Sequence, residues 1–234
     1  TSAPTPGTFL EKFREAAAKG NSVLCLTVSR KFSASYDSAR LAIEQANREM
    51  PETKIVLIDT KCAAGSQGLI IVESWKAALK GYSLEEVVKI VLPIVSRVRL
   101  LAFVDTMYYL WKGGRVSIAV HATSFILRIK PILELANGEI RRISASGGRR
   151  KAMSQLLELM EERLEEGSLR VAIVHADCIG DALELEDLIN EHFSCADLYI
   201  SEFTPAMGAH IGPGMLGLAF WTDTCSDLGV IPGS

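Results

Sequence analysis

The stretch Ser22-Val23-Leu24-Cys25-Leu26-Thr27-Val28 decides the fold of this chain, because it is a nearly continuous apolar run that ends in a polar loop. A run of this kind predicts a strand that is buried on both faces. The loop at 29–38 leads into a helical pattern at 36–49, and the same order recurs with a strand at 54–58 and a helix at 68–80. Two strand-helix units with short connections predict a parallel sheet covered by helices.

The pattern changes near residue 97, after two more helical segments at 9–19 and 83–97. Strand-like segments then predominate, and Asn137-Gly138 between two of them predicts a tight hairpin and therefore antiparallel pairs. We expect an α/β fold of two domains: a parallel-sheet α/β N-terminal domain at 1–98 and a mixed or antiparallel-sheet α/β C-terminal domain at 99–234. The expected elements of the second domain are strands at 100–104, 129–135, 139–144, 170–175, 197–202 and 216–221, with helices at 149–165 and 177–192.

Composition and charge narrow the class of protein. The chain has 234 residues, 48% of them hydrophobic, which suffices for one large core or two smaller ones. A net charge of −3 argues against nucleic-acid binding. No apolar run reaches the roughly 18 residues of a membrane span, so we expect no stable membrane insertion. The five scattered cysteines are typical of reduced thiols and predict a cytoplasmic protein.

The segment GAHIGPGMLG at 208–217 allows two functional interpretations. Gly212, Gly214 and Gly217 match the G-x-G-x-x-G dinucleotide fingerprint, whereas His210 beside a Gly-Pro-Gly turn can hold an acidic group in a pocket. The fingerprint requires a helix directly after the glycines. The residues after Gly217 are strand-like, so we favour the second interpretation and expect no nucleotide cofactor.

Patterns typical of a hydrolase or a metal site are weak. Gly65-Ser66-Gln67-Gly68 lies between a strand and a helix, but Ala64 stands where the nucleophile elbow G-x-S-x-G requires its first glycine. We therefore favour a helix start built from small residues. No H-x-x-x-H or H-E-x-x-H pair occurs, so we expect no metal site. The four histidines are His121, His175, His192 and His210.

A basic run, Arg141-Arg142 with Arg149-Arg150-Lys151, is balanced by nearby glutamates. A solvated face is the favoured interpretation, and a docking surface for an acidic partner is the alternative.

Hydroxyl groups and one imidazole remain as the strongest candidate chemistry. Such groups donate hydrogen bonds to a carboxylate without adding full charge of their own, which suits an acid whose remainder is apolar. Several donors must converge, because burying an unpaired carboxylate is costly. Spacing along the chain does not by itself bring them together. The candidates are Thr1, Ser2, Ser29, Ser33, Ser35 and His210.

Motifs along nearly the whole chain resemble the DegV family of bacterial fatty-acid-binding proteins, and they occur in the family's order. The opening at 1–6 resembles T-S-x-P-[ST]-P, and the loop at 29–39 resembles S-S-K-L-S-G-T-Y-x-S-A. The segment DTMYYLWKGGR at 105–115 is similar to D-T-L-x-Y-L-x-x-G-G-R. The series is completed by IDT at 58–60, IKPIL at 129–133 and GAHIGPG at 208–214.

The resemblance implies a DegV-like fold that encloses one long-chain fatty acid between its domains. It implies that Thr1, Ser33 and His210 hold the carboxylate, and we include Ser2, Ser35 and Gly212 in the expected site. No cofactor other than the bound fatty acid is implied. The preference for chain length would depend on side chains at the tunnel end, such as Met107 or Phe125.

The resemblance also implies a partner. Family members present the bound acid to a fatty acid kinase subunit, which forms an acyl-phosphate for phospholipid synthesis. Arg149 and Arg150 are the expected docking residues. The chain would then be a carrier subunit with no catalytic residue of its own.

Two departures from the family pattern bear on these expectations. The family's D-S-T-x-D-L segment does not occur, and the chain opens on Thr1 without an initiator methionine, so we expect an opening segment to be missing. Ala34 and Ser35 replace the glycine and threonine of S-G-T, which keeps a hydroxyl but removes the freedom of glycine at positive φ. A serine-dependent acyl-ester hydrolase that uses His210 as base remains the alternative function.

Overall fold

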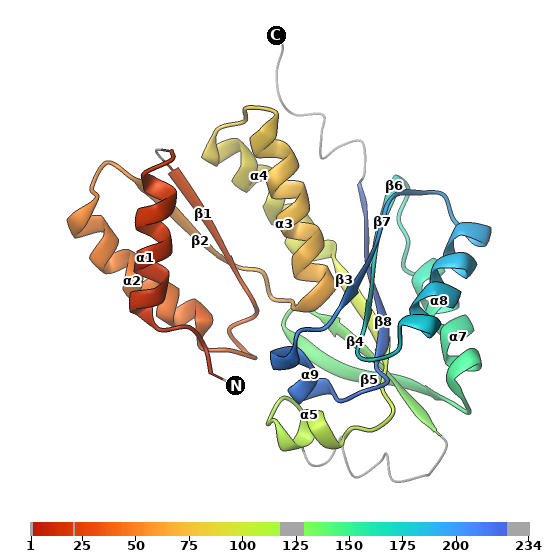
Figure 1. The fold of residues 1–234 in the computed structure, drawn as a ribbon. Helices are drawn as coiled ribbons and strands as arrows, with labels where there is room; N and C mark the ends of the chain where they lie inside the picture. Colours follow the sequence, from red (N-terminus) through yellow and green to blue (C-terminus); the bar gives the residue numbers. More distant parts are fainter. Residues whose placement is uncertain (1, 21, 118–128, 224–234) are drawn as a thin grey trace.

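A computed structural model describes residues 2–20, 22–117 and 129–223 of the chain, which form two sheets and their covering helices (Figure 1). The helices are α1 (Pro6–Ala17), α2 (Ser35–Glu49), α3 (Ala64–Leu79), α4 (Leu84–Arg97), α5 (Tyr108–Lys112), α7 (Arg149–Glu161), α8 (Ile179–His192) and α9 (Pro205–Ile211). The strands are β1 (Ser22–Thr27), β2 (Lys54–Asp59), β3 (Arg99–Phe103), β4 (Lys130–Ala136), β5 (Glu139–Ser146), β6 (Ser168–His175), β7 (Cys195–Glu202) and β8 (Leu216–Asp223).

The first two strands pair in parallel, as their sequence predicts, with Ser22 opposite Lys54 and Thr27 opposite Asp59. Helices α1 and α2 cover one face of this small sheet (Figure 1). Their buried apolar residues are Leu10, Phe13, Ala39, Ala42 and Ala46. The carboxyl ends of both strands lie at the same edge, so the polar loops that follow them are neighbours. Ser29 N donates to Cys62 O across that edge at 2.9 Å.

The second sheet has six strands in the order β5-β4-β3-β8-β6-β7. All neighbours in it are antiparallel except β6 and β7, which are parallel and are joined through α8. This confirms the prediction of a mixed α/β fold. The hairpin between β4 and β5 turns at Asn137 and Gly138, whose φ values are 52° and 74°, the left-handed conformation that this residue pair favours.

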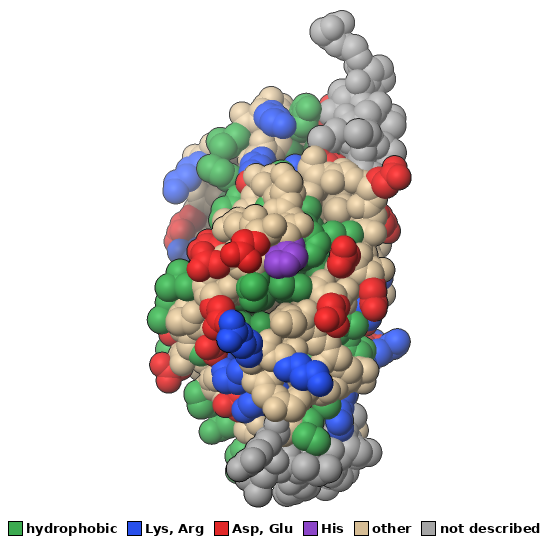
Figure 2. Space-filling model, turned by 90° about the vertical axis from the view of Figure 1, so that its right-hand side faces the viewer, with side chains coloured by type: hydrophobic (Ala, Val, Ile, Leu, Met, Phe, Trp, Pro, Cys, Tyr) green, Lys and Arg blue, Asp and Glu red, His purple; other side chains and the backbone are tan. Residues whose placement is uncertain are grey.

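Helices α7 and α8 cover one face of the six-stranded sheet. Leu156 and Met160 of α7 and Leu185 of α8 are buried in the core between the helices and the sheet. Figure 2 views the molecule from this side and shows acidic and basic side chains mixed over the surface.

Helices α3 and α4 cover the opposite face of the large sheet and also touch the small one. Leu69, Ile70 and Val91 pack in one continuous core with Val174 and Ala219 of the large sheet. Leu24, Leu26 and Val56 of the small sheet pack against the same core. The two helices therefore form a layer between the sheets, as Figure 1 shows. Ser83 caps α4, with its side chain accepting from Glu86 N. The division into domains at residues 98 and 99 stays a prediction.

Helix α3 begins four residues earlier than its sequence pattern predicts, because small residues allow its first turn to lie directly on the sheet. A Cβ added to Gly65 would lie 2.8 Å from Val174 Cγ1 and 3.1 Å from Ala219 Cβ. The short helices α5 and α9 were not expected either. Thr204-Pro205 is the signal that was missed for α9, since proline is favoured at the first helical position.

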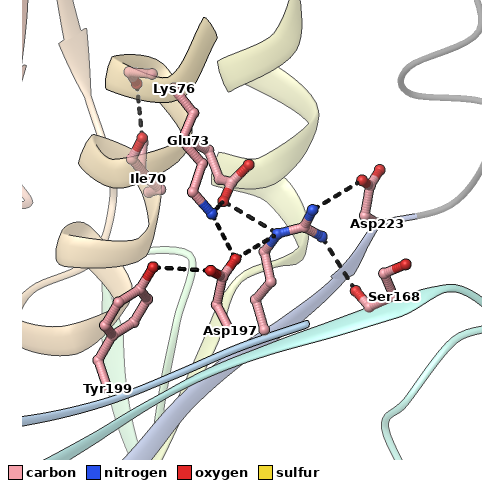
Figure 3. A network of polar contacts seen from close by, with 9 residues as sticks. Ile70, Glu73, Lys76, Ser168, Asp197, Tyr199 and Asp223 are labelled. Atoms are coloured by element: carbon pink, nitrogen blue, oxygen red, sulfur yellow. Dashed lines mark hydrogen bonds and ion pairs between the residues drawn. The ribbon is translucent and has the colours of Figure 1, made fainter. Parts of the chain in front are cut away.

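A network of charged side chains fastens α3 to the edge of the large sheet (Figure 3). Lys76 Nζ lies 2.5 Å from Asp197 Oδ2 and 3.0 Å from Glu73 Oε1. Arg170 Nε lies 3.1 Å from the same Glu73 oxygen, and Arg170 Nη2 lies 3.3 Å from Asp223 Oδ2. Burial acts to raise the pKa of Asp197, but hydrogen bonds from Lys76 and Tyr199 hold that pKa below its ordinary value. The network fixes α3 over β6, β7 and β8.

The contact of Gly65 with the sheet predicts opposite outcomes for two similar substitutions in α3. Gly65→Ala should lower the free energy of unfolding by about 1–3 kcal/mol, because the added methyl group overpacks the sheet. Gly68→Ala is the matched control: nothing lies within 4 Å of its added Cβ, and alanine is the better helix former by about 1 kcal/mol. Urea unfolding of both variants measures the difference. A Gly65→Ala variant as stable as Gly68→Ala would contradict this packing.

Candidate lipid-binding cavity

A cavity of about 390 Å³ lies where the loop after β1 and the start of α3 meet β3, β4, α5 and α9. Its wall is mostly apolar, and its floor includes Leu100, Ala102, Leu133 and Leu135 of the large sheet. The other apolar lining residues are Ala3, Val28, Phe32, Ala34, Ala63, Ala64, Leu110, Ile140, Phe203, Ala206, Met207, Ile211 and Met215. The volume falls within the range of about 300–1,000 Å³ that is usual for small-molecule sites.

Five polar side chains complete the described lining: Ser2, Ser33, Gln67, Arg115 and His210. None of the described lining residues is Asp or Glu, and Arg115 carries the permanent charge among them. Each polar side chain offers at least one hydrogen-bond donor. The cavity therefore suits a ligand that is largely apolar and ends in an anionic group.

The loop after β1 presents Ser33 to the cavity and places Ser35 behind it. The two hydroxyl oxygens lie 2.8 Å apart, and Ser35 N donates to Ser33 Oγ at 3.2 Å. When Ser35 Oγ is the donor, Ser33 Oγ accepts two hydrogen bonds and its own O–H remains available to a ligand. Ser35 is buried and is not among the described lining residues, so it supports Ser33 from behind.

Neighbouring segments hold this loop in place. Arg115 Nη2 donates to Phe32 O at 3.0 Å, and Lys31 Nζ lies 3.0 Å from Glu139 Oε1 at the β4-β5 hairpin. Ser29 is completely buried, and a Cβ added to Gly138 would lie 2.9 Å from its Oγ. Ser29 therefore has a structural position in the loop and is not among the lining residues.

Helices α5 and α9 interlock through two glycines, and this contact positions His210. A Cβ added to Gly113 would lie 2.7 Å from His210 Nδ1, so only glycine leaves room for the imidazole. Gly212 ends α9 with φ 81°, and a Cβ there would lie 2.2 Å from Tyr109 Cδ2. Gly212 is not in the described lining. It enables the packing that directs the neighbouring histidine into the cavity.

The surroundings of His210 favour its neutral form. Burial, and then the positive charge of Arg115, lower the pKa of the imidazole below its ordinary value. Neutral imidazole still has one N–H to donate. An anion bound nearby would oppose both influences and would stabilise the protonated form.

The structure brings together Ser2, Ser33 and His210, three of the residues expected to bind the ligand. Thr1 and Phe125 lie outside the described residues. Met107 is fully buried in the core and is not in the described lining, so its expected place at the tunnel end is not observed. The sequence reasoning missed Gln67 and the role of Arg115, although the GGR of segment 105–115 contains the arginine.

The two arginines expected to dock a partner differ in their surroundings. Arg149 is held between Asp105 and Asp181 and donates to Gly214 O at 2.7 Å. Arg150 is 90% exposed, and its Nε lies 3.6 Å from Glu184 Oε1. Both stand in the first turn of α7.

Ser66 and the glycine run lie in surroundings that differ from those of a nucleophile elbow and a dinucleotide fingerprint. Ser66 is completely buried and its Oγ donates to Ala63 O at 2.7 Å, unlike the exposed hydroxyl of a nucleophile elbow. Gly217 lies in β8, so the glycine run leads into a strand and not into a helix. A Cβ added to Gly217 would be 2.7 Å from Leu101 O.

Within the described ranges, no cluster of three or more His, Cys, Asp or Glu side chains could hold a metal ion. The helices there are all too short or too polar to span a bilayer.

Comparisons with known proteins agree with this architecture. The family model described as "Uncharacterised protein, DegV family" matches residues 1–223. A DegV domain-containing protein of Clostridium perfringens is 30% identical over 218 residues, which cover 92% of this chain and 75% of the relative. A DegV lipid-binding protein of Thermotoga maritima has a solved structure that is 30% identical, with a TM-score of 0.82, covering 94% of this chain and 76% of that one.

A further solved structure, of a Thermotoga maritima protein reported to reveal fatty acid binding function, is 29% identical with a TM-score of 0.81. The match covers 95% of this chain and 77% of the other. The fold and cavity define a two-sheet α/β protein with a largely apolar site, whose described lining has polar side chains but no Asp or Glu. The chain belongs to the DegV family.

The interlocked glycines predict different effects for two substitutions at α9. Gly212→Ala should lower the free energy of unfolding by at least about 1 kcal/mol, because the residue has positive φ and faces the Tyr109 ring. Gly208→Ala, within α9, is the control. Nothing lies within 4 Å of its added Cβ, so it should be neutral or slightly stabilising. Thermal unfolding of both variants provides the measurement, and equal melting temperatures would refute the assignment.

Proposed function

We propose that this protein binds one long-chain fatty acid in the cavity, with the carboxylate beside Ser33, His210 and Ser2. The observation that carries the proposal is the lining itself, which is apolar except for donors and includes no acidic side chain among the described residues. The related Thermotoga maritima proteins, which are described as lipid-binding or fatty-acid-binding, support it. No acidic side chain of the described wall would repel a carboxylate.

The two parts of the ligand would contribute differently. Burial of the acyl chain contributes about 0.8 kcal/mol per CH₂ and dominates affinity. The hydroxyls and the imidazole replace the water that the carboxylate loses and fix its orientation. Ser35 supports this arrangement by orienting Ser33.

We further propose that the protein is a cytoplasmic carrier that presents the bound acid to a fatty acid kinase subunit, which forms acyl-phosphate for phospholipid synthesis. Arg150 is better placed than Arg149 to bind an acidic surface of the partner, because two carboxylates of this chain already hold Arg149. The site would deliver its substrate without a catalytic residue of its own.

Replacing Ser33 tests the binding site. Ser33→Ala should weaken palmitate or oleate binding about tenfold to 100-fold, because a hydrogen bond to a charged group contributes about 1.5–3 kcal/mol. Isothermal titration calorimetry measures the effect, with circular dichroism to verify folding. Ser201→Ala, at an exposed position of β7, should leave binding unchanged. Identical affinities for both variants and the wild type would place the carboxylate elsewhere.

A covalent probe separates the carrier from the serine-dependent hydrolase. Native mass spectrometry of protein purified from cells should show a co-purified C14 to C18 acid, and a fluorophosphonate probe should leave the protein unlabelled. Labelling of a cavity serine would instead support the hydrolase. A protein that carries no acid and takes up neither palmitate nor oleate would overturn the binding proposal.

A further inference from the structure

A second cleft, of about 750 Å³, lies at the carboxyl ends of β6 and β7, the parallel pair of the large sheet. It is on the face that α7 and α8 cover, whereas the cavity described above is on the opposite face, where α3 and α4 pack. The carboxyl ends of parallel strands are a common position for a ligand. The described lining of the cleft consists of His175, Asp177, Cys178, Ile179, Gly180, Ile200 and Glu202.

The strands bring a histidine and a glutamate together in this cleft. Val171 and Ile173 of β6 face the core beneath α7 and α8, so His175 points to the same side by strand alternation. In the parallel register, His175 lies opposite Glu202 of β7. Neighbouring strands are about 4.8 Å apart, and paired residues share a face. The imidazole and the carboxylate are therefore neighbours.

The imidazole and the two carboxylates of the cleft have no partner in the part of the chain that the structure describes. His175 is 4% exposed, and its Nδ1 is buried without a hydrogen bond. Asp177 and Glu202 make neither a hydrogen bond nor an ion pair with the described residues. A buried polar atom that has lost its hydrogen bonds to water and gained none is unfavourable. All three groups are thus available to a ligand.

The charge of the cleft favours a cation. Asp177 and Glu202 supply two full negative charges, and the described lining includes no Lys or Arg. The N-terminus of α8 acts in the opposite direction, but a helix end carries only about half of a positive charge. The two carboxylates outweigh it, so the local charge is negative.

A primary ammonium group matches these acceptors better than a metal ion does. Across the described ranges, no three His, Cys, Asp or Glu side chains are arranged to hold a metal. An ammonium group has three N–H donors, which the Nδ1 of a neutral imidazole and the carboxylate oxygens can accept. Ile179, which is 53% exposed, and Ile200 offer apolar contacts to the alkyl chain that carries the ammonium group.

We propose that this cleft is a second binding site, which accepts a primary ammonium group on a short alkyl chain. His175, Asp177 and Glu202 are its hydrogen-bond acceptors. The site lies apart from the proposed fatty acid site and does not depend on it. A free alkylamine and the lysine side chain of another protein share this chemistry, and a comparison of two probes distinguishes these sources.

Butylammonium and 1-butanol test the preference for a cation, because they share an alkyl chain and differ in charge. Each is titrated against the whole ¹⁵N-labelled chain at about pH 8, where histidine is mostly neutral and a primary amine is still charged. Butylammonium should shift the NMR signals of the cleft, including the imidazole nitrogens of His175, and 1-butanol should not. Signals that stay unchanged, or that respond equally to both compounds, would overturn the inference.

Removing both carboxylates tests the acceptors. The double variant Asp177→Asn with Glu202→Gln changes two exposed positions, so we expect it to fold. It should bind butylammonium about fivefold more weakly or worse, because one ion pair with an exposed carboxylate contributes up to about fivefold in affinity. Glu191→Gln, at an exposed position near the other end of α8, is the matched control and should leave the affinity unchanged. Equal affinities of the double variant and the wild type would contradict the site.

A blocked lysine, Nα-acetyl-lysine methylamide, identifies the source of the ammonium group. Tighter binding than butylammonium supports the site as a receptor for a lysine of a partner protein, and weaker binding supports it as a site for a free alkylamine. Palmitate binding to the double variant should equal that of the wild type. The failure of this inference and the failure of the proposed function are therefore distinguishable.

Discussion

The layer formed by α3 and α4 is the element on which the rest of the structure depends, because it buries an apolar face of each sheet. Its first turn lies so close to β6 and β8 that Gly65 has no room for a side chain. The ion network of Lys76 and Arg170 fixes the same helix at the sheet edge. This placement brings the loop after β1 over the large sheet. The cavity forms beside the layer, where Leu100 and Leu133 are covered by the loop, α5 and α9.

The polar part of the cavity depends on close backbone contacts. Gly113 admits the imidazole of His210, and Gly212 admits the ring of Tyr109, so a side chain of each short helix packs against the glycine at the end of the other. Arg115 then joins this pair to the loop of Ser33 through the Phe32 carbonyl. The glycines of segment 208–217 serve packing and the exit from α9, which explains their resemblance to a nucleotide motif without its function.

The charges of the described lining suit the binding of a carboxylate. Ser33 has a neighbouring hydroxyl, His210 has a lowered pKa, and the described lining includes no Asp or Glu. The same set of donors, together with the permanent charge of Arg115, suits a bound carboxylate. Under the proposed function, the site holds its ligand by burial and hydrogen bonding, and the chemical step belongs to the proposed kinase subunit.

The sequence by itself determined what depends on near neighbours. Apolar runs specified the strands, Asn137-Gly138 specified the hairpin, and motif order identified the family. Only the tertiary structure decided that α3 and α4 serve both sheets, and that Ser33, His210 and Arg115 line the same cavity. These contacts join residues far apart in the chain, and no local preference encodes them. They follow from how the two sheets bury their apolar faces against a shared layer, which is a property of the whole fold.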